Sequence, residues 1–322
     1  MEPQDGSVRD VRSFFVRHPT PLLHTLDDAQ LEARCPLDNG MHLVLPNTPI
    51  GDINRLPLEL INQVLGRLDI PTLTTFRRVN QRAMHLVDSL PSYRRIWTTC
   101  PDILRAAVSL NANSFSCDTI FKTLIREKCE FCGEFFGGYL YLITCTRICH
   151  VCHWGLEHSP VEPSTAIRHF QELKMDYLVE KLKTLPQVHS LPGCYGPGRR
   201  RIVSEDRKTL IDRMAIMNLT KEDCGYAYPL ANEPDDCPEN PRRNMAIISA
   251  PYLSRQGQTS EWGLFCSLCA NYLPFFEIKY RAQDMVPHFE RWHVEDSDAP
   301  WYMFYPEAVM RWSNYSPAGR VY

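Results

Sequence analysis

Two Cys-x-x-Cys pairs constrain the fold of this sequence more than any other feature. Cys129 and Cys132 form the first pair, Cys149 and Cys152 form the second, and sixteen residues separate the two pairs. Each Cys-x-x-Cys turn directs two thiolates to one point, and a hairpin between the turns brings all four into a tetrahedron around Zn²⁺. The strand-like stretch GGYLYLITCTR between the pairs fits such a hairpin. Because four protein ligands leave no position for water, the spacing predicts a structural zinc site, not a catalytic one.

Two further candidate ligands lie beside this set, Cys145 and His153. Either could replace one of the four cysteines. Otherwise Cys145 is expected to be a small buried residue on a strand, and His153 a surface side chain. The second pair disfavours a redox dithiol, because thiol exchange needs only one Cys-x-x-Cys.

A second possible metal site follows late in the chain, with Cys266 and Cys269 preceding His288 and His293 in zinc-finger order. The spacing of the histidines suits zinc, although Pro287 is expected to interrupt the helix that carries His288. The alternative is a buried Cys-x-x-Cys with two surface histidines. The surrounding acidic residues are Asp284, Glu290 and Glu295. Their charge would repel phosphate, so a finger that reads nucleic acid is disfavoured.

Composition narrows the class of protein. Thirteen cysteines, clustered in Cys-x-x-Cys pairs, favour metal binding in a reducing compartment over disulfides. A formal net charge of -3 offers no global attraction to nucleic acid or anionic membranes. No apolar run approaches eighteen residues, and the first ten residues lack the layout of a secretory signal. We expect a soluble protein of the cytoplasm, the nucleus or both.

The chain divides into five regions by pattern. Residues 1–49 show no sustained periodicity and are expected to be mobile. A helical module at 50–100 precedes a helical region at 101–228 that contains the first cysteine cluster. The proline-rich, charged residues 229–243 suggest a linker that uncouples the aromatic-rich region 244–322 from the helical module. The expected fold class is mainly α with small β zinc modules: a three-helix module followed by an α+β cysteine-rich region.

The helical module at 50–100 has apolar residues at three- and four-residue steps. The pattern predicts one helix from Asn54, a second from Pro71 to Leu86, and a third that begins near Ser92. Three short helices cannot cover all of their apolar faces against each other. Part of that apolar surface is therefore expected to meet another protein.

The same residues resemble a known family. The series LPLELI, then VL, LD and FRRVN, strongly resembles the F-box. The resemblance implies binding to a Skp-type adaptor and, through it, to a cullin. The residues that it assigns to the adaptor contact are Leu56, Pro57, Ile61, Leu65 and Leu73.

The order of motifs along the chain also resembles a family of fungal F-box proteins with a late cysteine-rich module. The shared features are the knuckle run CEFCGEFFGGYLYLITCTRICHVC and the SLPG loop at 190–193. The family pattern ends in histidine followed by cysteine, and His293 stands near that last position. The resemblance does not imply a target.

No catalytic motif occurs in this sequence: it has no phosphate-binding glycine loop, nucleophile elbow or His-Glu-x-x-His helix. We therefore expect a non-enzymatic substrate receptor of a cullin-type ubiquitin ligase, with one or two structural zinc ions and an unknown protein target. The alternatives are a zinc-binding regulatory or nucleic-acid-binding protein, and an F-box protein that acts outside degradation. The triplet Arg199–Arg201 is expected to be a solvated turn.

Overall fold

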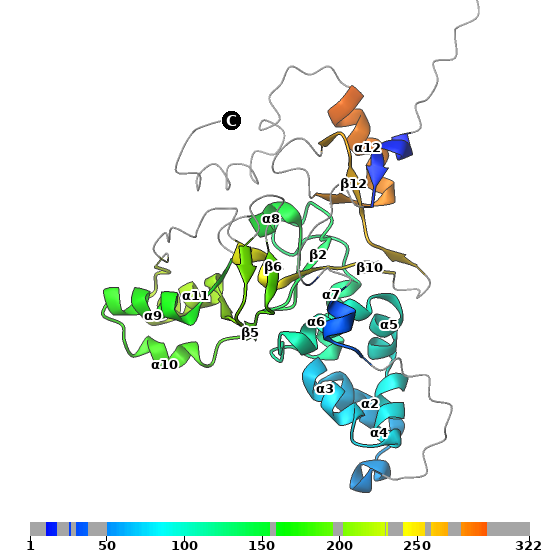
Figure 1. Ribbon diagram of the computed structural model, residues 1–322, viewed down its shortest axis with the longest axis vertical. Helices are drawn as coiled ribbons and strands as arrows, with labels where there is room; N and C mark the ends of the chain where they lie inside the picture. The colour runs from blue at the N-terminus through cyan, green and yellow to red at the C-terminus, as the bar shows by residue number, and fades with distance from the viewer. Residues whose placement is uncertain are drawn as a thin grey trace, which may run out of the picture.

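The computed structural model describes residues 11–17, 26, 30–37, 50–154, 159–195, 202–228, 230, 241–254, 259–269 and 278–294. Helices dominate the first part of the chain, and five small antiparallel sheets follow (Figure 1). The expected fold class, mainly α with small β modules, is confirmed. Within these ranges, no helix has both the length and the apolar character that crossing a bilayer requires.

The helical module at 50–100 contains four α-helices instead of the expected three. They are α2 (Leu58–Gly66), α3 (Ile70–Arg77), α4 (Gln81–Ser89) and α5 (Pro91–Thr99). The predicted second helix is divided at Asn80, whose side chain accepts a hydrogen bond from the Ala83 N–H at 2.8 Å and starts α4. Asp69 caps α3 in the same way through the Thr72 N–H. An asparagine that satisfies a free helical N–H group favours a new helix start over continuation.

Two more helices, α6 (Pro101–Ser109) and α7 (Cys117–Leu124), join this module to the rest of the chain. Gly66, at the end of α2, faces Asp118 of α7, and a Cβ at position 66 would lie 2.5 Å from the Asp118 carboxylate. The same carboxylate accepts a hydrogen bond from Ser92 Oγ at 2.8 Å. The glycine therefore permits a close approach between two helices.

Within residues 1–49, the described parts form short elements. They form a 3-10 helix η1 (Val11–Phe14), strand β1 (Phe15–Val16) and helix α1 (Gln30–Arg34). Leu26 and Leu31 are fully buried in the largest core, and Glu32 pairs with Arg105 of α6 at 2.8 Å. Short elements lack a periodic sequence pattern, so their order comes from contacts with distant residues.

The knuckle hairpin belongs to a sheet that the two halves of the chain share. Strands β2 (Tyr139–Tyr141), β3 (Thr146–Ile148) and β9 (Ile247–Ser249) lie in the order β3-β2-β9, with Leu140 paired to both Arg147 and Ile248. Most of the expected linker, residues 229 and 231–240, lies outside the described residues. Its last residues, 241–243, belong to the 3-10 helix η5 (Pro241–Met245). Because β9 completes this sheet, the late region is directly joined to the first cysteine cluster.

A second core lies beside this sheet. Helices α9 (Pro163–Glu172), α10 (Leu178–Leu182) and α11 (Arg213–Cys224) pack with the sheet β4-β8-β5. Its strands are β4 (Pro160–Val161), β5 (Gln187–His189) and β8 (Thr209–Asp212). Strands β6 (Gly193–Tyr195) and β7 (Ile202–Ser204) pair with each other, and the Arg199–Arg201 triplet between them lies outside the described residues.

A third, small core contains the late cysteines. Strand β12 (Leu264–Cys266) lies between β1 and β13 (Lys279–Tyr280), and helix α12 (Met285–Phe289) continues into a π-helical turn η9 (Glu290–Val294). Strands β10 (Tyr252–Leu253) and β11 (Ser260–Glu261) form a ribbon next to it. In Figure 1, this core and the helices α2–α4 lie at opposite ends of the molecule. Residues 295–322, the last part of the aromatic-rich region, lie outside the described residues.

Candidate metal centres and adaptor surface

The first cysteine cluster brings together the four residues that the spacing predicted. The Sγ atoms of Cys129, Cys132, Cys149 and Cys152 all lie within 4.8 Å of one another. The Sγ atoms of Cys132 and Cys149 are 3.8 Å apart. Around zinc, with Zn–S bonds of about 2.3 Å, the edge of a sulfur tetrahedron is about 3.8 Å. The geometry therefore fits a zinc ion.

The backbone explains why these cysteines converge. Gly133 adopts a φ of +68°, and its N–H donates to the Cys129 carbonyl at 2.9 Å, which closes the first turn. The hairpin β2-β3 then returns the chain, and helix α8 (His150–Trp154) begins directly after Cys149. The Cys152 N–H donates to Cys149 Sγ at 3.4 Å. Backbone N–H groups aimed at sulfur favour the thiolate form.

Hydrogen bonds among the four thiols divide their protonation unevenly. Those from Cys129, then Cys149 and Cys152, hold the pKa of Cys132 well below its ordinary value. Burial raises the pKa of Cys149, and hydrogen bonds with Cys129 and Cys132 raise that of Cys152. Burial also raises the pKa to about 12 for the solitary cysteines Cys100, Cys117 and Cys145. The thiolate is the form that binds metal, and Cys132 is the thiol of this cluster most inclined to ionise.

Neither alternative ligand belongs to the first cluster. Cys145 lies in the turn between β2 and β3, buried, with its Sγ 3.8 Å from Thr123 Oγ1. His153 is only 5% exposed, so the expectation of a surface side chain is corrected. Its Nε2 lies 3.4 Å from Asn244 Oδ1, and its carbonyl accepts a hydrogen bond from Arg243. The 3-10 helix η5, far along the chain, therefore covers His153.

The second cluster consists of Cys266, Cys269, His288 and His293, with all ligand atoms within 4.8 Å of one another. His293 Nε2 lies 3.4 Å from the Sγ of both cysteines, and His288 Nε2 lies 3.4 Å from Cys269 Sγ. A zinc tetrahedron has a sulfur-to-nitrogen edge of about 3.5 Å, given its bond lengths. The hydrogen bond between Cys266 and Cys269 lowers the pKa of Cys266 to about 3 and raises that of Cys269. This set also fits zinc.

Pro287 does not interrupt the helix that carries His288, contrary to our expectation. Helix α12 begins at Met285, so Pro287 is its third residue. The N–H groups of the first turn have no acceptor within the helix, and a proline there removes no helical hydrogen bond. The chain continues through η9, which places His293 beside His288 with ring centroids 5.2 Å apart.

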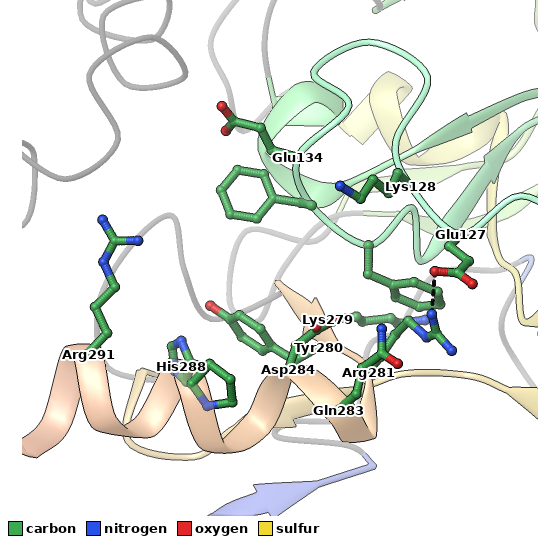
Figure 2. Close-up of a pocket in the computed structure, with 13 residues that line it drawn as sticks. Glu127, Lys128, Glu134, Lys279, Tyr280, Arg281, Gln283, Asp284, His288 and Arg291 are labelled. Carbon is green, nitrogen blue, oxygen red and sulfur yellow. Dashed lines mark ion pairs between the residues drawn. The ribbon is translucent and has the colours of Figure 1, made fainter.

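A cavity of about 300 Å³ lies between the two metal clusters. Figure 2 shows Lys128 and Glu134 of the knuckle loop on one side and Arg291 of η9 on the other. An ion pair between Glu127 and Arg281 links the two sides of this cavity. Arg281 also bonds Glu261 at 2.7 Å, which raises its pKa. These contacts, like strand β9, tie the late module to the first cluster.

The five residues assigned to the adaptor contact divide into two groups. Leu56 is 44% exposed and Pro57 is also exposed, so both are available to a partner. Ile61 and Leu65 are each 4% exposed and Leu73 is fully buried, so these three side chains lie inside the chain's own core. Their apolar spacing reflects internal packing in this conformation.

Sequence reasoning missed the outward side of the same helix. Leu60 and Val64, one turn apart on α2, are 45% and 55% exposed. The other large apolar residues exposed in this module are Ile53, Leu58 and Val79. The sequence did carry a sign of this exposed side, because α2 has apolar residues on both of its faces. Packing against the core of the chain requires only one apolar face. Such a patch indicates a protein interface.

One family model matches this chain: the F-box domain, at residues 53–95. The matched range covers η2 (Gly51–Arg55) in part and helices α2 to α4 entirely, and it ends within α5. No curated protein and no solved structure matches the chain.

Proposed function

Because the chain is an F-box protein, with its F-box domain at residues 53–95, we propose that it is the substrate-recognition subunit of an SCF-type ubiquitin ligase. In this role the domain binds a Skp-type adaptor, and the adaptor connects the protein to a cullin. The remainder of the chain holds a target protein. The contribution to ubiquitin transfer is proximity, because holding two reactants together raises the rate without catalytic residues in the receptor.

The exposed apolar row on α2 is the observation that carries this proposal. Leu60 and Val64 lie one turn apart on α2, Leu56 directly precedes the N-cap Pro57, and all three are exposed. Burying such side chains contributes roughly 1.5–3 kcal/mol each. A partner that covers them gains a helix-in-groove contact.

We propose that both cysteine-containing clusters hold structural zinc. The four thiols of the first cluster and the two thiols with two imidazoles of the second are the donor sets that Zn²⁺ prefers. All four positions of each tetrahedron would be filled by protein atoms. Zinc would therefore brace the target-binding region and supply no chemistry of its own.

The nucleic-acid alternative receives little support from the described residues. It requires a coherent basic face that includes Arg242 and Arg243. Arg242 instead pairs with Glu162 at 3.1 Å, and Arg243 is buried with its Nη1 bonded to the His153 carbonyl. A role outside degradation would leave the cellular lifetime of the bound target unchanged, whereas a degradative role would shorten it.

The proposed location is the cytoplasm, the nucleus or both.

Affinity purification of the Leu60→Ala/Val64→Ala variant tests the assignment. We expect it to lose adaptor and cullin while its zinc content and melting temperature stay at the wild-type level, because both side chains are exposed. Substitution of the buried Ile61 would confound binding with folding. The matched control is Val203→Ala/Val286→Ala, two exposed valines outside the F-box domain. Unchanged recovery of cullin by the α2 variant would refute the proposed role.

A further inference from the structure

The described N-terminal residues lie against the second metal cluster, although the sequence separates them widely. Strand β1 pairs with β12 in antiparallel register, with Phe15 opposite Cys266 and Val16 opposite Phe265. Both the N–H and the Oγ of Ser267 donate to the Phe14 carbonyl, at 2.8 and 2.9 Å. The segment therefore adds a strand to β12 and bonds to the Cys-x-x-Cys turn.

Two adjacent aromatic side chains complete this contact. Phe14 stacks on Phe289, with ring centroids 5.3 Å apart. Phe15 packs edge-on against His288 at 5.9 Å and Tyr280 at 6.2 Å. Phe15 is 8% exposed, whereas Phe14 is only partly buried. The strand edge and the aromatic wall behind it together form a groove, here called the β12 groove (Phe265, Ser267, Tyr280, His288 and Phe289).

The occupant of the β12 groove is short. Two residue pairs join β1 to one edge of β12, and two pairs join β13 to the opposite edge. Without β1, the N–H and C=O groups of β12 on this side would be open to an added strand. Open strand edges recruit extended peptides, and flanking side-chain pockets select among them.

We propose that the β12 groove is a peptide-binding site for an extended segment with two adjacent aromatic residues, and that residues 11–17 occupy it as a displaceable plug. Assigning the competing segment to the target of the ligase rests on the proposed function. The groove itself does not depend on it. The chemistry is backbone pairing plus two aromatic pockets, which any chain with an exposed aromatic pair in extended form can satisfy.

An internal anchor keeps the plug near its groove. Leu26, nine positions after Arg17 in the sequence, is fully buried in the largest core. A segment of the same chain meets its site intramolecularly, at an effective concentration above that of a dilute free peptide. A free peptide must therefore outcompete the plug, so the intact chain would reject weak ligands and accept a target that binds at several points.

The test uses the full-length chain and a fluorescent peptide of residues 11–17, VRSFFVR. The Phe14→Ala/Phe15→Ala variant should bind this peptide roughly tenfold more tightly than the wild type, because its own plug is weakened. The control peptide VRSAAVR should bind neither protein. The matched control variant is Tyr226→Ala/Tyr228→Ala, which removes another aromatic pair, with ring centroids 5.2 Å apart. This control should behave like the wild type.

Zinc content decides whether the segment is a plug or an integral part of the core. The Phe14→Ala/Phe15→Ala variant is expected to retain the zinc content of the wild type. Loss of zinc from the second cluster, equal peptide binding by variant and wild type, or no binding by either would overturn the proposal. The Leu60→Ala/Val64→Ala variant should bind the peptide as the wild type does. A result against the β12 groove is therefore distinguishable from a result against the adaptor assignment.

Discussion

Single residues in this protein have roles that depend on a distant partner. Gly66 is an example, because α7 places the Asp118 carboxylate where a Cβ at position 66 would lie. Helix propensity alone predicts a gain of about 1 kcal/mol for Gly66→Ala. The contact with Asp118 reverses this expectation.

We expect Gly66→Ala to lower the free energy of unfolding by about 1–3 kcal/mol, the usual cost of overpacking. Relief of the overlap requires Asp118 to move, which weakens its 2.8 Å hydrogen bond from Ser92. Urea unfolding of Gly66→Ala, Asp118→Ala and the double variant measures the coupling. If Gly66→Ala stabilises the protein in the presence of Asp118, the close approach is not a constraint.

Cysteines of the knuckle run also differ in their roles. Cys132→Ser should remove one zinc ion per chain, because structural zinc contributes roughly 10–16 kcal/mol of binding energy in small peptides. Cys145→Ser should retain all zinc, since its pKa of about 12 reflects a protonated, buried thiol. Elemental analysis of both purified variants reports the difference. Equal zinc loss in the two variants would move Cys145 into the ligand set.

At the scale of elements, His288 and His293 join α12 and η9 to the turn that carries Cys266 and Cys269. His288→Ala/His293→Ala should lose the second zinc ion and become sensitive to protease within residues 285–294. The first zinc ion and adaptor capture should persist, because the sheet β3-β2-β9 uses neither histidine. His85→Ala/His189→Ala, outside both clusters, is the matched control. A variant that keeps full zinc content and protease resistance would show these histidines to be ordinary side chains.

At the scale of the whole molecule, the two metal clusters contact different cores. The largest core contains Leu73 and Ile96 of the helical module at 50–100 together with Cys129 and Cys149. Cys266 and Cys269 belong to the small third core, which Phe135 and Val151 connect to the first cluster. Loss of a ligand from the first cluster should therefore destabilise the helical module. Loss of a ligand from the second cluster should not.

Hydrogen exchange measures this difference directly. In Cys132→Ser, amides of α3 and α5 should exchange faster than in the wild type, because they share a core with the lost metal. In Cys269→Ser, the same amides should exchange at the wild-type rate, and faster exchange should be confined to residues 259–294. The opposite ranking of the two variants would contradict the division into cores.

The sequence by itself located the F-box region and the two groups of candidate metal ligands. Both depend on local spacing, because helical periods and Cys-x-x-Cys turns involve only neighbouring residues. It also indicated that apolar surface in the F-box region would face a partner.

Only tertiary structure decided which apolar residues point outward, how His153 is covered, and that β9 joins the late region to the knuckle hairpin. The fold of the described N-terminal residues was likewise invisible in the sequence. Strand β1 has two residues and pairs with a strand about 250 positions away. Such pairing leaves no periodic pattern, because its stability comes from the distant partner and not from the segment itself.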